Sequence, residues 1–325
     1  MKNLLRRLIF YIITMWAAVT FTFFLVRLMP GDPAQSMINR YQGQISADAI
    51  NSIRVMFGLD KTTSTWTQYW QYWGQLLHGD MGISFKNFPT PVADVIAQSL
   101  PWTIGLVGVV TIISFVLGSL IGVTLGWHRG SVADAVIPIT TFFSSIPYFW
   151  IALVLSFTLG VSHQIFPFYG GFSKNLIPGW SWSFVVSVLY HAILPALTII
   201  IVSIAGWILG MRNMMITVSS EDYVTVAHAK GLSESTVMYG YAARNAILPQ
   251  ISGFSLSLGF VVSGSLVMEQ VFSYPGIGYA LFAAVGAKDY PLMQGIFLII
   301  TFSVLVANIV ADVVYAILDP RTRRD

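Results

Sequence analysis

Between two strongly apolar runs in the second half of the chain lies a polar segment whose residue types suit binding to another protein. It extends from Ser219 to Pro249 and reads SSEDYVTVAHAKGLSESTVMYGYAARNAILP. Ser219 followed three residues later by Asp222 predicts a capping-box helix start, and Glu221 adds negative charge to a first turn where the helix dipole favours it. Gly231 is placed to end this helix in a left-handed conformation.

The same segment predicts a second helix, which is capped by Ser233 and ends at Pro249. Two short helices joined at a glycine form an elbow, and residues 219–249 are called the elbow below. An elbow is an unusual means of merely connecting two membrane spans, so we interpret it as a docking site for a soluble partner. The alternative interpretation is an ordinary connecting loop.

Motifs for catalysis and cofactor binding are missing from the sequence. There is no G-x4-G-K-[ST] phosphate loop, and none of the six lysines follows a glycine, so the chain does not bind ATP by that route. Gly-Ile-Gly at 276–278 leads to no strand–helix unit, which excludes a dinucleotide fingerprint. H-E-x-x-H and G-x-S-x-G are absent, there is no cysteine, and the five histidines lie far apart. We therefore predict no catalytic residue, no metal site and no cofactor bound by this chain.

The composition places the chain among membrane proteins. Of the 325 residues 55% are hydrophobic and only 10% are charged, against about 25% charged in a soluble domain. The net charge of +3 is too small and too scattered to indicate nucleic acid. Six apolar runs, at about 8–26, 95–127, 134–160, 192–211, 246–271 and 292–318, are long enough to cross a membrane. We expect an all-α integral membrane protein with six transmembrane helices and a large outer loop after the first.

Glycines in two of these runs predict where helices pack on one another. Gly118, Gly122 and Gly126 repeat every fourth residue and so share one helix face, and the fourth span carries the pair Gly206 and Gly210. In lipid, small residues allow close backbone approach, which is a main source of helix association. We interpret the stripe as a packing face and not as part of a substrate path.

Two prolines, Pro138 and Pro147, lie in the third predicted span. A proline frees backbone carbonyls that need a neighbouring helix or water. The sequence leaves open whether they mark a bend used in gating or a tolerated kink.

Charged side chains within spans usually indicate ion-coupled transport, because they are costly in lipid. Here Glu269 lies near the outer end of the fifth span and Asp312 near the inner end of the sixth, and the middle of every span lacks charge. This weakens a proton- or sodium-driven carrier, although backbone carbonyls can also coordinate sodium. For both residues we favour a structural hydrogen bond over contact with substrate.

The long section after the first span contains a series of aromatic residues at helical spacing. The series is Trp66, Tyr69, Trp70, Trp73 and Leu77, and Gly79 stops the pattern. One interpretation is a helix at the membrane surface, where Trp and Tyr are favoured. The other is a surface for a partner or a flat-faced ligand.

The elbow resembles the cytoplasmic coupling motif of ABC-importer permease subunits, and in its details that of the dipeptide/oligopeptide/nickel permease family. The pattern is E-D-Y-V-x3-A-x-A-K-G-L followed by A-x-R-N-A-x-L-P. The matching residues are Tyr223, Ala227, Ala229, Lys230, Gly231, Arg244, Asn245, Leu248 and Pro249. Where the broader motif has Glu-Ala-Ala, this chain has Thr225, Val226 and Ala227, a departure that the oligopeptide branch shares.

Further signatures extend the resemblance over essentially the whole chain. They are R-L-x-P-G-D-P-A, H-G-D-M-G-x-S, P-V-x-x-V-I, E-x-V-F-x-Y-P-G-I-G, D-Y-P and D-P-R-T-R, in this order. The resemblance implies a type I ABC-importer permease fold, with the first outer loop facing the substrate-binding protein. It divides the chain into a first helix with a cytoplasmic N-terminus (1–28), an extracytoplasmic loop region (29–98), a five-helix permease core (99–318) that contains the elbow, and a cytoplasmic tail (319–325).

The distribution of basic residues predicts the same orientation without the resemblance. With six spans and the amino terminus inside, ten of the seventeen Lys and Arg residues lie in inner segments and two in the shorter outer segments. The remaining five lie in or beside the long outer section, which the positive-inside rule discounts. Both termini and the elbow are therefore expected in the cytoplasm.

The resemblance implies a function for the chain as a whole. It is expected to form half of a translocation pathway in the cell membrane of a prokaryote, with a second permease chain, two ATP-binding subunits that hold ATP and Mg²⁺, and an extracytoplasmic binding protein. Surrounding lipid is the other expected partner, and nucleic acid is not one. The residues implied to contact the ATPase are Glu221, Asp222, Tyr223, Ala227, Lys230 and Gly231.

Two questions stay open at the level of sequence. Short peptides are the first choice of substrate, oligosaccharides or nickel chelates are the alternatives, and the residues along the pathway are unknown. A self-sufficient channel or secondary carrier, with the elbow as a plain loop, is the competing class of protein.

Overall fold

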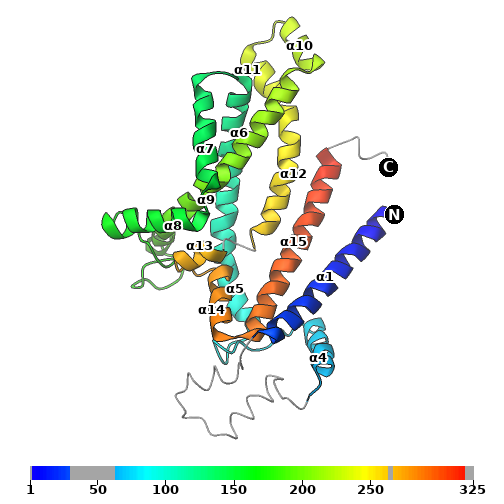
Figure 1. Ribbon diagram of the computed structural model, residues 1–325, viewed down its shortest axis with the longest axis vertical. Coiled ribbons are helices and arrows are strands. Elements are labelled where there is room, and N and C mark those ends of the chain that lie inside the picture. The colour runs from blue at the N-terminus through cyan, green and yellow to red at the C-terminus, as the bar shows by residue number, and fades with distance from the viewer. Residues whose placement is uncertain (1, 30–62, 263–265, 319–325) are drawn as a thin grey trace. The chain divides into compact units, whose positions relative to one another are not determined.

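The computed structural model describes residues 2–29, 63–262 and 266–318 (Figure 1). Within this part the regular structure is helical, apart from an isolated antiparallel bridge between Ile83 and Pro91. The prediction of an all-α fold is confirmed for the described residues. Most of the predicted outer loop, at 30–62, and the predicted tail, at 319–325, lie outside them.

The chain forms two compact units, Met1–Pro101 with Gly276–Leu305 and Trp102–Pro275 with Val306–Asp325. The first contains α1 (Lys2–Leu28), α4 (Thr65–Leu77), α14 (Ile277–Ala287), most of α5 (Val92–Thr103) and the first half of α15 (Tyr290–Leu318). The second contains η1 (Ile104–Gly108), α6 (Val109–Trp127), η2 (Val132–Ala135), α7 (Val136–Ser145), α8 (Tyr148–Leu155), η3 (Ser156–Ser162), α9 (Trp182–Ser219), α10 (Asp222–Ala229), α11 (Glu234–Thr236), η4 (Val237–Ala243), α12 (Arg244–Phe260) and α13 (Leu266–Val271). Of the η segments, η2 is a 3₁₀-helix and the other three are π-helical.

Four described helices are long and apolar enough to cross a membrane. They are Ile9–Leu28, Val92–Trp127, Trp182–Ser219 and Tyr290–Ala311. These helices confirm four of the predicted spans. The third of them is much longer than predicted, because Ser181 caps its start by accepting a hydrogen bond from the Phe184 backbone N–H at 3.4 Å.

The third predicted span is not one continuous helix. Helices α7 and α8 meet at a bend of 95°. Pro147 lacks a backbone N–H and disfavours helical geometry in the residue before it, and Ile146 is accordingly extended at φ −80° and ψ 130°. The proline therefore marks a sharp bend and not a tolerated kink, which were the two alternatives that the sequence left open.

The region of the fifth predicted span also consists of two helices, with α12 ending at Phe260 and α13 beginning at Leu266. Residues 263–265 between them lie outside the description. The sequence analysis missed α14, a short apolar helix that ends at Lys288 in a left-handed conformation with φ 55°. Its length of 11 residues is too short to have been recognised as a span.

Helices α6 and α9 approach one another so closely that side chains are excluded along one line. A Cβ atom on Gly118 would lie 2.5 Å from Cβ of Trp207, and one on Gly122 would lie 2.7 Å from the Ile208 carbonyl oxygen. At Gly126 it would lie 2.5 Å from Cβ of Met215. The prediction that these glycines form a packing face is confirmed.

The second pair of glycines behaves differently. A Cβ on Gly206 would meet no other heavy atom within 4 Å, whereas one on Gly210 would lie 2.6 Å from the side-chain amide of Gln250. Only Gly210 of this pair therefore lies at a close contact, and the contact is with the flexible end of a side chain.

In the first unit the aromatic helix α4 packs on α1. Tyr69 is buried, its ring lies 5.3 Å from that of Phe23, and its hydroxyl shares a 2.8 Å hydrogen bond with Thr20. Gly79 follows the helix at φ 77°, as the sequence predicted. One side of α4 therefore packs on α1, while the side chains of Trp66 and Trp70 are exposed.

A buried carboxylate fixes the segment between α4 and α5 to the start of α15. Asp289 accepts hydrogen bonds from the hydroxyl of Ser84 at 2.5 Å and from the backbone N–H of Lys86 at 2.8 Å. It also accepts from the N–H of Leu292 in the first turn of α15, where the helix dipole favours negative charge.

The contact between α6 and α9 leads to a direct test. In the variant Gly122→Ala the added methyl group meets the Ile208 carbonyl, and we expect a loss of about 1–3 kcal/mol in stability. The thermal midpoint of the detergent-solubilised protein measures this change. Gly206→Ala adds the same group to the partner helix in open space and serves as the control. Equal midpoints for the two variants would contradict close packing at Gly122.

Candidate functional site

The first helix of the elbow begins two residues later than the sequence predicted. Ser219 is the last residue of α9, and its hydroxyl donates to the Ile216 carbonyl at 2.8 Å, so it caps no helix start. The N-cap position of α10 belongs to Glu221, which has extended backbone and makes no side-chain capping bond. The predicted capping box is therefore wrong. Met215 and Val218 in the last turns of α9 are buried, and this helix therefore extends as far as Ser219, the residue that suggested a new helix start.

Gly231 forms the turn between the two helices of the elbow, as predicted. Its φ of +74° lies in the left-handed region, and its N–H donates to the His228 carbonyl at 2.9 Å. Apart from its chain neighbours, no heavy atom of the described residues lies within 4 Å of where its Cβ would be. Glycine is therefore favoured by the left-handed backbone conformation and not by lack of space for a side chain.

The second arm starts where predicted but does not end there. Ser233 occupies the N-cap position of α11, and its hydroxyl shares a 2.7 Å hydrogen bond with that of Thr236. The chain then continues through the π-helical η4 into α12, and Pro249 lies inside α12. The predicted helix end at Pro249 is wrong, because prolines in membrane helices are tolerated where other groups satisfy the freed carbonyls.

One face of the elbow packs against the C-terminal ends of α6 and α9. The buried residues of this cluster are Val123, Met211, Met215, Val218, Val224, Ala227, Val237, Met238, Ala242 and Ala246. Ala227, one of the six predicted coupling residues, is 1% exposed and belongs to the cluster. It therefore lies on the face that joins the elbow to the helices.

The other five predicted residues are exposed at the two ends of α10. Glu221, Asp222, Lys230 and Gly231 are exposed, and Tyr223 is 37% exposed. Partial burial of its ring and the Glu221 carboxylate raise the pKa of Tyr223 above its ordinary value, against a hydrogen bond with Asn245 that lowers it. Its hydroxyl is therefore neutral at physiological pH.

Sequence reasoning missed three exposed apolar or aromatic residues on the elbow. They are Val226, at 51% exposed, Tyr239 and Tyr241. The signal was present, since large apolar side chains in an otherwise polar segment often mark interaction surfaces. Together with the acidic start of α10 they make the free face of the elbow both charged and partly apolar.

Trp127, the last residue of α6, contacts both arms of the elbow. Its ring lies 5.9 Å from that of His228 on α10 at an interplanar angle of 23°, and its indole N–H donates to a carboxylate oxygen of Glu234 on α11 at 3.0 Å. This residue was also missed, because the contact depends on how α6 and the elbow meet and leaves no local pattern in the sequence.

A second polar contact joins the turn after α6 to α9. Arg212 and Asp134 form an ion pair with 3.5 Å between Nε and Oδ1. The other oxygen of Asp134 accepts a hydrogen bond from the Gly130 N–H at 2.8 Å. That hydrogen bond, and to a smaller degree Arg212, hold the pKa of the Asp134 carboxyl below its usual value. The carboxylate is therefore charged at any physiological pH.

The histidines take structural positions in the described chain. His78, His128, His163 and His191 each hydrogen-bond through Nδ1 to a backbone carbonyl four or five residues earlier. Within the described residues no three His, Asp or Glu side chains gather in a way that could hold a metal ion.

Glu269 makes the structural hydrogen bond predicted for it. The side chain is fully buried and accepts from the hydroxyl of Thr103 at 2.8 Å. The side chain of Asp312 lies outside the description.

Comparison with known proteins defines the class. The family of binding-protein-dependent transport system inner membrane components matches residues 118–324, and the N-terminal model of the same transport systems matches residues 1–107. The chain therefore belongs to this family. With four or five membrane-crossing helices in its described part, it is a multi-pass membrane protein.

Individual relatives indicate which transport systems within this family the chain is similar to. The chain is 32% identical to the oligopeptide transport system permease protein AppB of Bacillus subtilis, over 98% of each chain. It is 30% identical to the dipeptide transport system permease protein DppB of Lactococcus lactis and 32% identical to that of Escherichia coli, over 99% of each chain in both cases. These matches confirm the resemblance to dipeptide and oligopeptide permeases.

The contact of Trp127 with the elbow predicts a local change in stability. Trp127→Phe keeps an aromatic ring next to His228 but removes the donor to Glu234. Loss of a hydrogen bond worth about 1 kcal/mol should increase local opening of α10 and α11 roughly fivefold, measured by amide hydrogen exchange.

Glu234→Gln is the matched control, since its side chain keeps an acceptor oxygen for the indole N–H. It should exchange like the unmodified protein. Unchanged protection in Trp127→Phe would mean that this contact does not hold the elbow.

Proposed function

We propose that the chain is the transmembrane subunit of a type I binding-protein-dependent ABC importer and forms half of a translocation pathway for short peptides. The observation that carries the substrate class is the end-to-end match to relatives named for oligopeptide and dipeptide transport. The names of these relatives favour peptides over the alternatives of oligosaccharides and nickel chelates.

The elbow is proposed to dock on a separate ATPase and to carry its movement into the membrane. Its free face, with Glu221, Tyr223, Val226 and Lys230, offers charged and apolar groups to a partner. Its buried face and Trp127 join both arms to α6 and α9. A displacement of the docked elbow would therefore reach two long membrane helices.

The subunit is proposed to have no catalytic activity of its own, in keeping with its family of membrane components. ATP and Mg²⁺ would be held by two ATP-binding subunits, a second permease chain would complete the pathway, and an extracytoplasmic binding protein would deliver the peptide. These partners are proposed from the family membership and the resemblance of the elbow.

Six spans with both termini in the cytoplasm are proposed as the topology, in the cell membrane of a prokaryote. The four long helices and the bent pair α7–α8 account for five spans, and residues 246–271 for the sixth. The excess of basic residues on one side supports this orientation. It keeps the proposed division into a first helix (1–28), an outer loop region (29–98), a core (99–318) and a tail (319–325).

A self-sufficient channel or carrier is the competing function. In such a protein Glu269 would be a candidate for ion coupling. Its hydrogen bond with Thr103 gives this buried carboxylate a structural partner, which favours the importer.

The substrate class is tested by ATP hydrolysis in the reconstituted assembly with its binding protein. We expect a pool of di- to pentapeptides to stimulate hydrolysis and a pool of oligosaccharides to leave it at the basal rate. Stimulation by oligosaccharides alone would overturn the peptide assignment. Failure of any ATPase to assemble with the chain would overturn the importer itself.

The role of Gly231 is tested by a bulky substitution. Gly231→Val places a β-branched residue at a left-handed φ, which costs at least about 1–2 kcal/mol and should open or shift the turn. We expect the assembly to form in the membrane, ATP hydrolysis to persist, and peptide uptake per ATP to fall severalfold.

Gly240→Val is the matched control, because Gly240 lies in the same elbow, has ordinary helical φ and has open space around its Cβ position. Normal uptake in Gly231→Val would contradict the proposed role of the turn. Equal uncoupling in both variants would mean that bulk on the elbow matters, and not its backbone conformation.

A further inference from the structure

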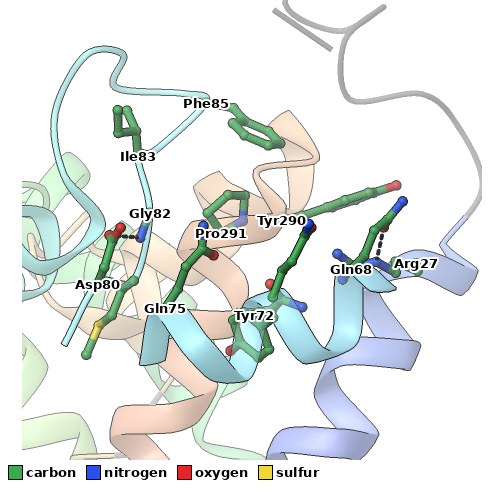
Figure 2. A pocket seen from close by; sticks show the side chains of 13 residues that line it. Arg27, Gln68, Tyr72, Gln75, Asp80, Gly82, Ile83, Phe85, Tyr290 and Pro291 are labelled. Atoms are coloured by element: carbon green, nitrogen blue, oxygen red, sulfur yellow. Dashed lines mark hydrogen bonds between the residues drawn. The ribbon is translucent and has the colours of Figure 1, made fainter. Parts of the chain in front are cut away.

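The first unit contains a polar cavity of about 240 Å³ that the proposed transport function does not use. The end of α1, one side of α4, residues 80–85 and the first turn of α15 enclose it (Figure 2). Figure 2 shows Arg27 with Gln68 on one side of Tyr72 and Gln75, and Asp80 with Gly82 on the other.

Arg27 brings a positive charge to this cavity that no described carboxylate balances. Its guanidinium lies 3.5 Å above the ring centroid of Phe23, its Nε donates to the side-chain oxygen of Gln68 at 3.2 Å, and its Nη1 donates to the Phe23 carbonyl at 3.3 Å. All of these partners are neutral. A partly buried cation is stable only when an anion or several dipoles replace its lost hydration.

Tyr72 does not supply that anion. Burial raises the pKa of its hydroxyl to about 12, and the nearby charge of Arg27 opposes the shift only in part. The hydroxyl is therefore a neutral donor at physiological pH. Asp80 also lines the cavity, but among the described residues it forms no ion pair with Arg27, and its carboxylate accepts the Gly82 N–H at 2.8 Å.

Gln294 gives a second, independent indication of a ligand. Its side chain lines the cavity from α15 and is 5% exposed, and its Nε2 has no hydrogen-bond partner among the described residues. A buried N–H donor without a partner costs about 1–3 kcal/mol. Ligand oxygens in the cavity would satisfy both this amide and the guanidinium.

The position of the cavity indicates where the anion comes from. Arg27 is the penultimate residue of the span Ile9–Leu28, so the cavity lies at the membrane boundary. Leu28 is 82% exposed, and α4 next to it exposes Trp66 and Trp70. Such residues are typical of the level of lipid headgroups. Phosphate oxygens are the anionic groups present at that level in every bilayer.

We propose that this cavity binds the phosphate of a phospholipid headgroup, with Arg27 as the charged contact and Gln294 as a neutral donor. The glutamines of α4 that line the same cavity, Gln71 and Gln75, offer further hydrogen bonds to the polar part of the lipid. The bound lipid would hold α1, α4 and α15 together at their outer ends.

The test uses the assembled complex in detergent and counts phospholipids that stay bound, by native mass spectrometry during titration with phosphatidylglycerol and phosphatidylethanolamine. We expect Arg27→Gln to weaken the tightest lipid site about tenfold, because a hydrogen bond to a charged group is lost. Arg6→Gln, at the exposed opposite end of α1, removes the same charge and should leave this site unchanged.

Gln294→Leu separates ligand binding from folding. It removes an amide that has no described protein partner, so the thermal midpoint without lipid should not fall, while lipid binding weakens severalfold. A lower midpoint with unchanged lipid binding would mean that Gln294 is structural and would overturn its assignment.

Two other outcomes would also overturn the proposal. If inorganic phosphate at millimolar concentration displaces the lipid fully, the site serves soluble phosphate. If Arg27→Gln keeps its lipid but loses affinity for the extracytoplasmic binding protein, the anion is a carboxylate of that partner. Neither result bears on the proposed coupling function of the elbow, because that function is tested separately by ATP hydrolysis and peptide uptake.

Discussion

The close approach of α6 and α9 is the constraint on which the second unit depends. A methyl group at Gly118, Gly122 or Gly126 would overlap the opposite helix, so the backbones meet without side chains between them. In lipid this contact gains little from hydrophobic burial, and fit of the two surfaces has to hold the helices together. The C-terminal ends of both helices then form one surface, and the elbow packs on it.

That surface explains the two faces of the elbow. Val224 and Ala227 of α10 and Val237 and Met238 of the second arm are buried against α6 and α9. Residues next to them in the sequence are exposed, among them Tyr223 and Val226. The small side chain of Ala227 is buried in this cluster, where α10 packs on its neighbours.

Local patterns predicted the parts of this arrangement that depend on local physics. The left-handed turn at Gly231 was predictable because glycine commonly ends a helix in this conformation. The packing face of α6 was predictable from the four-residue spacing of its glycines. The position of Gly79 after an aromatic helix was predictable for the same reason. Each of these residues has a backbone requirement that few other residue types meet.

The errors arose where tertiary packing overrode local signals. Ser219 resembles a capping residue at a helix start, yet it is the last residue of α9, whose final turn contains the buried Val218. Pro249 resembles a helix end, yet α12 includes it. The contacts of Trp127 with His228 and Glu234, and the cavity at Arg27, join residues far apart in the sequence, so no spacing rule could have found them.

The π-helical turn η4 has a consequence for how this segment tolerates changes in length. It connects α11 of the elbow to α12 without a break. A π turn holds one more residue than an α turn, so loss of one residue between 237 and 243 can restore regular α-helix without breaking the chain's hydrogen bonds. The same loss rotates everything before it by about 100° around the helix axis. A shortened chain would therefore keep a continuous helix but turn a different side of α11 toward the helices on which the elbow packs.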